Sequence, residues 1–343
     1  MMMKVTLSQI ERITSELLGK AGLNEENVKI VTDIYMRATY HGVGHHDIHN
    51  IPGTLRNLTS GKIKSNPSIV RLHQHGALES YEGDNGLGEY CGAFVMKRAM
   101  HLAEKHGISL CSIRNSNHLL ACSPYVEMAA ENGYIGYIIT RGAPTMGAPG
   151  RKEKVIGTSP MGYAAPADKD YPIMFDACLS YASFGALDAK MKAGESVPSY
   201  WGLNAEGNPS TDPAAIANGT RLPIGGHKGF GLAILGEIIT GVLSEGQIID
   251  EPQPGTGEVG KPSHTAICIK ADGLMDIDRF KKRISEMKDR MRSRAENLRI
   301  PGQRAGEYKE KILQEGSLEF DEEFINELNQ WATKLGAAPI QKS

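Results

Sequence analysis

The chain has 343 residues, of which 40% are hydrophobic and 23% are charged, as expected for a globular protein with a sizeable core. Its formal net charge of -2 favours neither a nucleic-acid partner nor an anionic membrane. No apolar run reaches the roughly 18 residues of a membrane span, and the N-terminus lacks a signal-peptide pattern. Five scattered cysteines without a CxxC pair indicate reduced thiols, so we expect a cytoplasmic protein.

The first 40 residues predict two amphipathic helices. Apolar residues recur at helical spacing over residues 7–21, and Ser8 is a suitable N-cap. Asn24 begins the second helix, which leads into the sequence HGVGHHDIHN at residues 41–50.

Helices and strands alternate along the middle of the chain, which is typical of an α/β fold. Residues 62–63 and 69–72 predict a hairpin, and residues 195–226 predict a long irregular excursion. Further helices are predicted at 90–106, 125–131, 225–246, 276–294 and 322–335, and further strands at 108–113, 134–140, 162–165, 173–176 and 265–270.

Common nucleotide-binding and hydrolase fingerprints are missing. No GxGxxG both follows a strand and opens a helix, which argues against an ordinary dinucleotide-binding fold. The segment EGDNGLGEY at 82–90 resembles that fingerprint only loosely. Walker, HExxH and GxSxG motifs do not occur either.

The decapeptide 41–50 holds four of the eleven histidines: His41, His45, His46 and His49. A continuous helix would bring three of them onto one face as metal ligands. The two intervening glycines oppose such a helix, since each costs about 1 kcal/mol relative to alanine, and no further ligands complete the site, so we expect no metal. Two interpretations remain: histidines without a function at a helix end, or a proton donor for reduction of a carbonyl.

The chain resembles the type 2 malate/L-lactate dehydrogenase family over about residues 4–307. Five motifs in family-like order carry the resemblance: NSNH at 115–118, IGTSP at 156–160, the strand ending at Asp176, LPIGGHKGFGLA at 222–233 and IPGQ at 300–303.

The resemblance implies an α/β, non-Rossmann NAD(P)-binding fold with a central mixed sheet and helices at residues 76–275. It implies a helical N-/C-terminal domain from residues 1–75 and 276–343. It further implies a homodimer, a small-molecule substrate and a nicotinamide cofactor, NAD or NADP, with NAD slightly favoured. The cofactor contacts expected from the family are Pro172, Ile173, Met174, Phe175, Asp176, Ala177, Cys178, His227, Lys228, Pro301, Gly302 and Gln303.

The resemblance places the catalytic histidine at His46. The family's preceding serine is His45 here, the following glycine is Asp47, and the substrate-binding arginine is Asn50. Without that arginine the usual two-pronged contact with a carboxylate is lost. One alternative is that Arg56 takes the place of the missing arginine. Another is that the substrate is neutral and hydroxylated and is bound by Asn50.

Four further residues are expected at the substrate by the same resemblance. Asp188 or His45 would orient His46, and the remaining three would contact substrate: His118, Thr158 and Arg141.

The resulting hypothesis is an NAD(P)-dependent oxidoreductase that moves a hydride between nicotinamide and a small hydroxy, oxo or imino compound. The alternatives are a cofactor-binding sensor that has lost catalysis and a histidine-metal enzyme.

Overall fold

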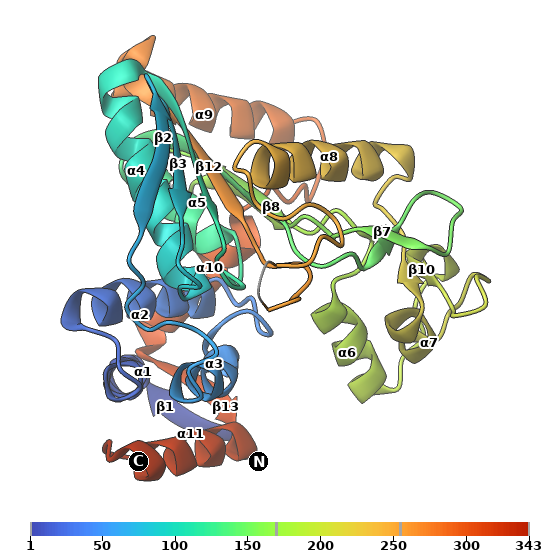
Figure 1. Cartoon of the computed structure of the whole chain (residues 1–343). Coiled ribbons are helices and arrows are strands. Elements are labelled where there is room, and N and C mark those ends of the chain that lie inside the picture. Colours follow the sequence, from blue (N-terminus) through green and yellow to red (C-terminus); the bar gives the residue numbers. More distant parts are fainter. Residues whose placement is uncertain (1, 169–170, 254–255, 342–343) are drawn as a thin grey trace.

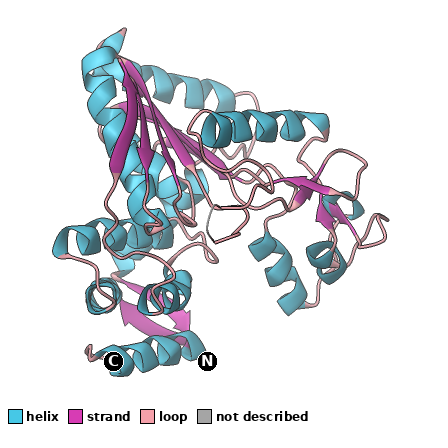
Figure 2. Cartoon of the chain, viewed as in Figure 1, coloured by secondary structure: helices cyan, strands magenta, loops and turns pink. Residues whose placement is uncertain are grey.

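The computed structural model describes residues 2–168, 171–253 and 256–341. Figure 1 shows three units: a helical unit that holds both termini, a large sheet with helices against it, and a smaller lobe beside the sheet. Figure 2 gives the same view with strands in magenta, which gather in these three places.

The helical unit is built from both ends of the chain. Strand β1 (Met2–Thr6) pairs antiparallel with β13 (Ser317–Asp321). The helices around this pair bury their apolar faces in one core cluster, in which Leu17 and Leu328 are fully enclosed. These helices are α1 (Leu7–Lys20), α2 (Glu25–Tyr40), η1 (Ile48–Asn50), α3 (Ile51–Thr59), α10 (Gln303–Glu315) and α11 (Glu322–Leu335).

The large sheet has the strand order β2-β3-β4-β12-β5-β8-β9. Only β3 and β4 pair in parallel, so the sheet is mixed, as the resemblance predicted. The strands are β2 (Val70–His75), β3 (Leu78–Glu82), β4 (Ile108–Arg114), β5 (Tyr134–Thr140), β8 (Met161–Ala165), β9 (Ile173–Ala177) and β12 (His264–Lys270). The associated helices are α4 (Gly88–His106), α5 (Ser123–Glu131), α8 (His227–Glu237), the π-turn η3 (Ile238–Val242), η4 (Ala271–Gly273) and α9 (Ile277–Arg292).

The smaller unit, which we call the cap lobe, has a short sheet in the order β10-β11-β6-β7. A small apolar cluster that includes Leu187 and Ile216 holds its helices together. Its elements are β6 (Met146–Gly147), β7 (Lys154–Ile156), α6 (Phe184–Ala193), η2 (Ser199–Trp201), β10 (Gly202–Leu203), α7 (Pro213–Asn218) and β11 (Thr220–Arg221). Residues 195–226, expected to be irregular, therefore contain two strands and a helix.

Two local predictions were wrong. The strand at 69–72 does not pair with residues 62–63; it is part of β2, which pairs with β3 across a turn at Gly76. The first helix is capped by Thr6 and not by Ser8, because the Thr6 side chain accepts from Gln9 N while Gln9 reaches back to Thr6 N.

The predicted domain boundary at residue 276 assigns α9 to the helical unit, whereas Figure 1 shows α9 beside the large sheet. The C-terminal part of the helical unit begins at α10. Among the described helices, none combines the length and apolar composition needed to cross a membrane.

Candidate active site

A cavity of about 970 Å³ lies where the three units meet. Its walls come from the loop after α2, from β9 with the residues that follow it, from the first turn of α6, and from the turn before α10. A volume of this size is within the range of small-molecule and cofactor sites. The predicted site residues that line it are His45, His46, Asn50, His118, Thr158, Met174, Phe175, Asp176, Ala177, Cys178, Asp188, Pro301 and Gly302.

The loop after α2, residues 41–50, is not helical across the histidines. Helix α2 ends at Tyr40, and Gly42 and Gly44 then adopt φ values of 62° and 76°, which only glycine adopts readily. The face that three histidines would have shared does not form. Buried Asp47 holds the loop instead, because its carboxylate accepts from Gly44 N at 2.9 Å and from His49 N at 3.0 Å.

Asn50 also holds this loop, since its side-chain Nδ2 donates to the backbone oxygen of His45. The two departures from the family sequence at Asp47 and Asn50 therefore have a structural role in shaping the loop. Arg56, considered as a replacement for the missing arginine, is exposed on α3 and does not line the cavity.

His46 lies between two other imidazoles. Its ring centroid is 4.3 Å from that of His45 and 4.9 Å from that of His118. Burial, with the repulsion of these two neighbours, lowers the pKa of His46 to about 3, so the ring is neutral at physiological pH. Its Nδ1 is buried without a partner among the described residues, and the residue lines the cavity.

His118 is oriented by a local hydrogen bond. Its Nδ1 accepts from Leu120 N at 3.1 Å, so in the neutral ring the proton is on Nε2. Burial lowers the pKa of His118 to about 4. A neutral imidazole fixed in this tautomer is a hydrogen-bond donor toward the cavity that it lines.

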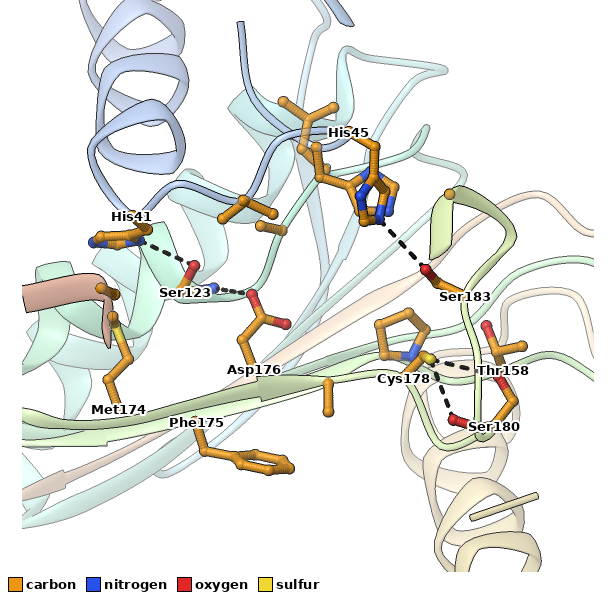
Figure 3. A pocket seen from close by; sticks show the side chains of 18 of the residues that line it. His41, His45, Ser123, Thr158, Met174, Phe175, Asp176, Cys178, Ser180 and Ser183 are labelled. Carbon is orange, nitrogen blue, oxygen red and sulfur yellow. Dashed lines mark hydrogen bonds between the residues drawn. The ribbon is translucent and has the colours of Figure 1, made fainter. Parts of the chain in front are cut away.

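The histidine loop touches the cap lobe at His45. Its Nε2 lies 3.4 Å from Ser183 Oγ (Figure 3), and its ring rests against Gly185 so closely that a Cβ there would overlap it. Of the two groups expected to orient His46, His45 lies against it. Asp188 lines the cavity but forms its ion pair with Lys192, at 2.8 Å, and makes no hydrogen bond to His46 in the described structure.

Asp176 is the penultimate residue of β9, which forms one wall. Its carboxylate accepts from Ser123 N at 2.8 Å, and Ser123 Oγ lies 3.0 Å from His41 Nδ1 (Figure 3). Burial raises the pKa of Asp176, although the hydrogen bonds from Ser123 oppose the shift. His41, which also lines the cavity, contacts the buried carboxylate of Glu127 at 3.1 Å, so it connects the wall to a buried polar network.

The turn before α10 fits a group with phosphates. Gly302 has a φ of 96°, and a Cβ there would lie 2.5 Å from the oxygen of Pro172, so the turn packs directly on the start of β9. The exposed guanidinium groups of Arg299 and Arg304 line the cavity at the N-terminus of α10. Positive side chains at a helix N-terminus suit an anionic cofactor.

Several predicted site residues lie elsewhere. Arg141 is fully buried and holds Glu237 at 2.9 Å, so it is not at the cavity. Its guanidinium also donates to the backbone oxygens of Lys261 and Ile249. Pro172 and Gln303 line an adjoining cavity, and three others line neither: Ile173, His227 and Lys228.

Sequence reasoning missed most of the cap-lobe wall. Tyr181, Ser183 and Phe184 follow the predicted strand but belong to no motif used for prediction. Arg221 directly precedes the LPIGGHKGFGLA motif, and this adjacency was the one available signal.

Comparison with known proteins identifies the family. The family described as malate/L-lactate dehydrogenase matches residues 5–329. A malate dehydrogenase of Pyrococcus horikoshii is 31% identical over 93% of this chain and 92% of its own length. A 2,3-diketo-L-gulonate reductase of Klebsiella pneumoniae is 35% identical over 80% of this chain and 82% of its own. The structure of sulfolactate dehydrogenase from Methanocaldococcus jannaschii has a TM-score of 0.87 at 28% identity and covers 98% of both chains. This chain therefore belongs to the malate/L-lactate dehydrogenase family and is an oxidoreductase.

Proposed function

We propose that the enzyme transfers a hydride between the nicotinamide of NAD or NADP and a small hydroxy, oxo or imino compound, with His46 as proton donor and acceptor. The observation that carries this proposal is the environment of His46. His46 lines the cavity, its ring is kept neutral by burial and by its two histidine neighbours, and its Nδ1 is enclosed without a partner among the described residues. A buried polar atom without a partner is uncommon, and a catalytic role is one of its recognised explanations.

The chemistry divides between the cofactor and the protein. When bound, the nicotinamide supplies or accepts the hydride. During oxidation, neutral His46 takes the hydroxyl proton of the substrate at Nε2, and it returns a proton to the oxygen during reduction. We propose that the Nε2 hydrogen of His118 donates to the same oxygen; the support is its tautomer, since Nδ1 accepts from Leu120 N. His45 fixes the position of His46, and Asp188 acts on His45 through its charge.

We propose that β9 and the turn before α10 hold the cofactor. Support comes from the backbone of Met174–Cys178 along the cavity wall and from the guanidinium groups of Arg299 and Arg304 at the N-terminus of α10. Contacts from His227, Lys228 and Gln303, a substrate contact from Thr158, and the preference for NAD stay predictions. Titration of the protein with each reduced cofactor, followed by nicotinamide fluorescence, tests the preference.

We also propose a homodimer in the cytoplasm. The outer face of α8 and η3 exposes a row of apolar side chains, more than an isolated surface helix usually shows, and a second copy would cover it. These side chains are Leu232, Leu235, Ile238, Val242 and Leu243. The five cysteines are free, in line with a reducing compartment. Light scattering of Leu235→Glu against the unaltered protein tests the interface, because a charge there should shift the mass toward the monomer.

A turnover assay separates this function from the sensor alternative. The absorbance of reduced nicotinamide is followed with a panel of 2-oxo acids, neutral ketones and polyols. We expect turnover with at least one carbonyl compound. Cofactor binding without turnover of any compound would favour a sensor, and elemental analysis of the purified protein tests the metal alternative.

A further inference from the structure

Arg221 is a cation in the cavity that the mechanism so far leaves without a task. Its side chain lines the cavity and is only partly exposed. Among the described residues, no carboxylate lies within ion-pair distance of it, and its guanidinium makes no hydrogen bond. Burial lowers its pKa, opposed by the neighbouring Cys178, so the guanidinium has lost hydration without gaining a carboxylate partner among the described residues.

The backbone of Arg221 is fixed at the cap-lobe wall. Strand β11 places it opposite Gly202 of β10 and beside Met146 of β6. The residues that follow run antiparallel to the segment after β9, since Tyr181 N donates to Leu222 O and Ile224 N donates to Leu179 O, both at 2.9 Å.

This register brings Arg221 level with Ala182, one residue before Ser183. Ser183 is the residue that meets His45 across the cavity at 3.4 Å. Arg221 thus lines the cavity from the cap lobe, and its backbone lies level with the residue next to this contact.

Asn50, at the position where the family has an arginine, does not provide a charged group to bind the substrate. Asn50 Nδ2 is engaged with the oxygen of His45, and an amide carries no charge. Arg299 and Arg304 are more exposed than Arg221, and Nη1 of Arg304 already donates to the oxygen of Gly42 in the loop 41–50 at 3.3 Å. Arg221 is thus the least exposed of the three arginines that line the cavity.

We propose that Arg221 binds the carboxylate of a 2-oxo or 2-hydroxy acid substrate, so that the charged anchor has moved from the histidine loop to the cap lobe. A planar guanidinium pairs with a carboxylate through two parallel hydrogen bonds, which fixes the orientation of the neighbouring carbonyl. The carboxylate also favours the protonated form of nearby His46 by its charge. This inference rests on the proposed function.

The test uses oxamate, an unreactive analogue of a 2-oxo acid, and the full-length enzyme with reduced cofactor. Loss of a charged hydrogen-bonding partner typically weakens binding roughly 10- to 100-fold, so we expect Arg221→Gln to raise the Kd of oxamate by that factor. Fluorescence of the bound nicotinamide reports this Kd independently of turnover. Arg221→Lys should recover part of the affinity, and the Kd of the cofactor should stay unchanged.

Two further variants sharpen the test. Arg151→Gln removes an exposed charge from the same lobe outside the cavity and should leave oxamate binding unchanged. Asn50→Arg added to Arg221→Gln should restore binding, because it returns an arginine to the position expected from the family. The KM for pyruvate should rise in Arg221→Gln, while the KM for neutral pyruvamide should not.

Failure of the Arg221 proposal can be distinguished from failure of the proposed function. Unaltered oxamate affinity in Arg221→Gln, an equal loss for pyruvate and pyruvamide, or no oxamate binding by the unaltered enzyme would each overturn the anchor. Absence of turnover with every carbonyl compound would overturn the proposed function, and oxamate binding would still decide about Arg221. Equal unfolding midpoints of the variants exclude misfolding as the cause.

Discussion

The two walls of the cavity differ in the kind of chemistry they offer. The loop 41–50 presents neutral imidazoles and is held by its own side chains, Asp47 and Asn50. The cap lobe presents Arg221 from a strand whose position is fixed by neighbours on both sides. In the mechanism that we propose, proton transfer and charge recognition belong to separate pieces of the chain, so a change in substrate charge need not disturb the proton donor.

The largest expected effect is the loss of the proton donor from the first wall. We expect His46→Ala to lower kcat by about 100- to 10,000-fold, the usual contribution of general acid–base catalysis. The Kd of the cofactor should be nearly unchanged, because His46 is assigned to the substrate side. Steady-state turnover and nicotinamide fluorescence measure the two quantities.

A matched control for this prediction lies in the same loop. His49 contacts Asp47 at 2.6 Å and stacks near Phe324 outside the cavity, so His49→Gln should keep turnover close to that of the unaltered enzyme. Near-normal turnover in His46→Ala would show that His46 is not the proton donor.

The next largest effect is expected at Arg141, and it distinguishes this structural arginine from Arg221 in the cavity. Arg141→Ala leaves Glu237 buried and unpaired, which typically costs about 3–5 kcal/mol of unfolding free energy. Urea unfolding measures this loss, and the KM for substrate should not change. Glu237→Gln in the same chain should recover part of the stability, because no unpaired buried charge then remains. A raised KM with normal stability would instead indicate that Arg141 contacts the substrate.

The pH dependence of kcat/KM tests whether His46 is neutral in the enzyme before substrate binds. Only protonated His46 can give a proton, and its protonated fraction falls tenfold for each unit above a pKa of about 3. The kcat/KM for reduction should therefore fall about tenfold per unit between roughly pH 6 and 8, while that for oxidation shows no step from His46 there. An inflection near the ordinary histidine pKa in either profile would contradict the lowered pKa.

The sequence was sufficient for the elements with strong periodicity. The helices at α2, α4 and α11 and the strands at β4, β5 and β12 appear close to the predicted bounds. Family motifs also led to most residues of the cavity wall at β9. Short strands such as β6, β10 and β11 were missed, because two residues carry no alternation of apolar and polar side chains.

The site residues also divide into those that a sequence motif fixed and those that depend on the fold. His46 and Asp176 were accessible because a motif or a neighbouring motif fixed their place. Arg221 was not, since its position in the cavity depends on pairing between β11 and residues after β9 that are about 40 apart in sequence. Arg141 was wrongly expected at the substrate, because the sequence does not reveal that Glu237 lies within 2.9 Å of it.

The smallest expected effect comes from the point where the two walls touch. A Cβ on Gly185 would lie 2.1 Å from His45 Cδ2, so Gly185→Ala must displace the His45 ring from Ser183 and from the face of His46. Alanine in the first turn of α6 is itself favourable by up to about 1 kcal/mol, so the unfolding midpoint should stay equal or rise. We expect kcat/KM to fall roughly tenfold, the cost of a modest misplacement of a catalytic group, with the cofactor Kd unchanged. Gly53→Ala is the control, because its Cβ meets nothing within 4 Å in α3 and should leave kcat/KM unaltered. Equal kcat/KM in both variants would show that contact between the walls does not position His46, and that each wall acts on the substrate independently.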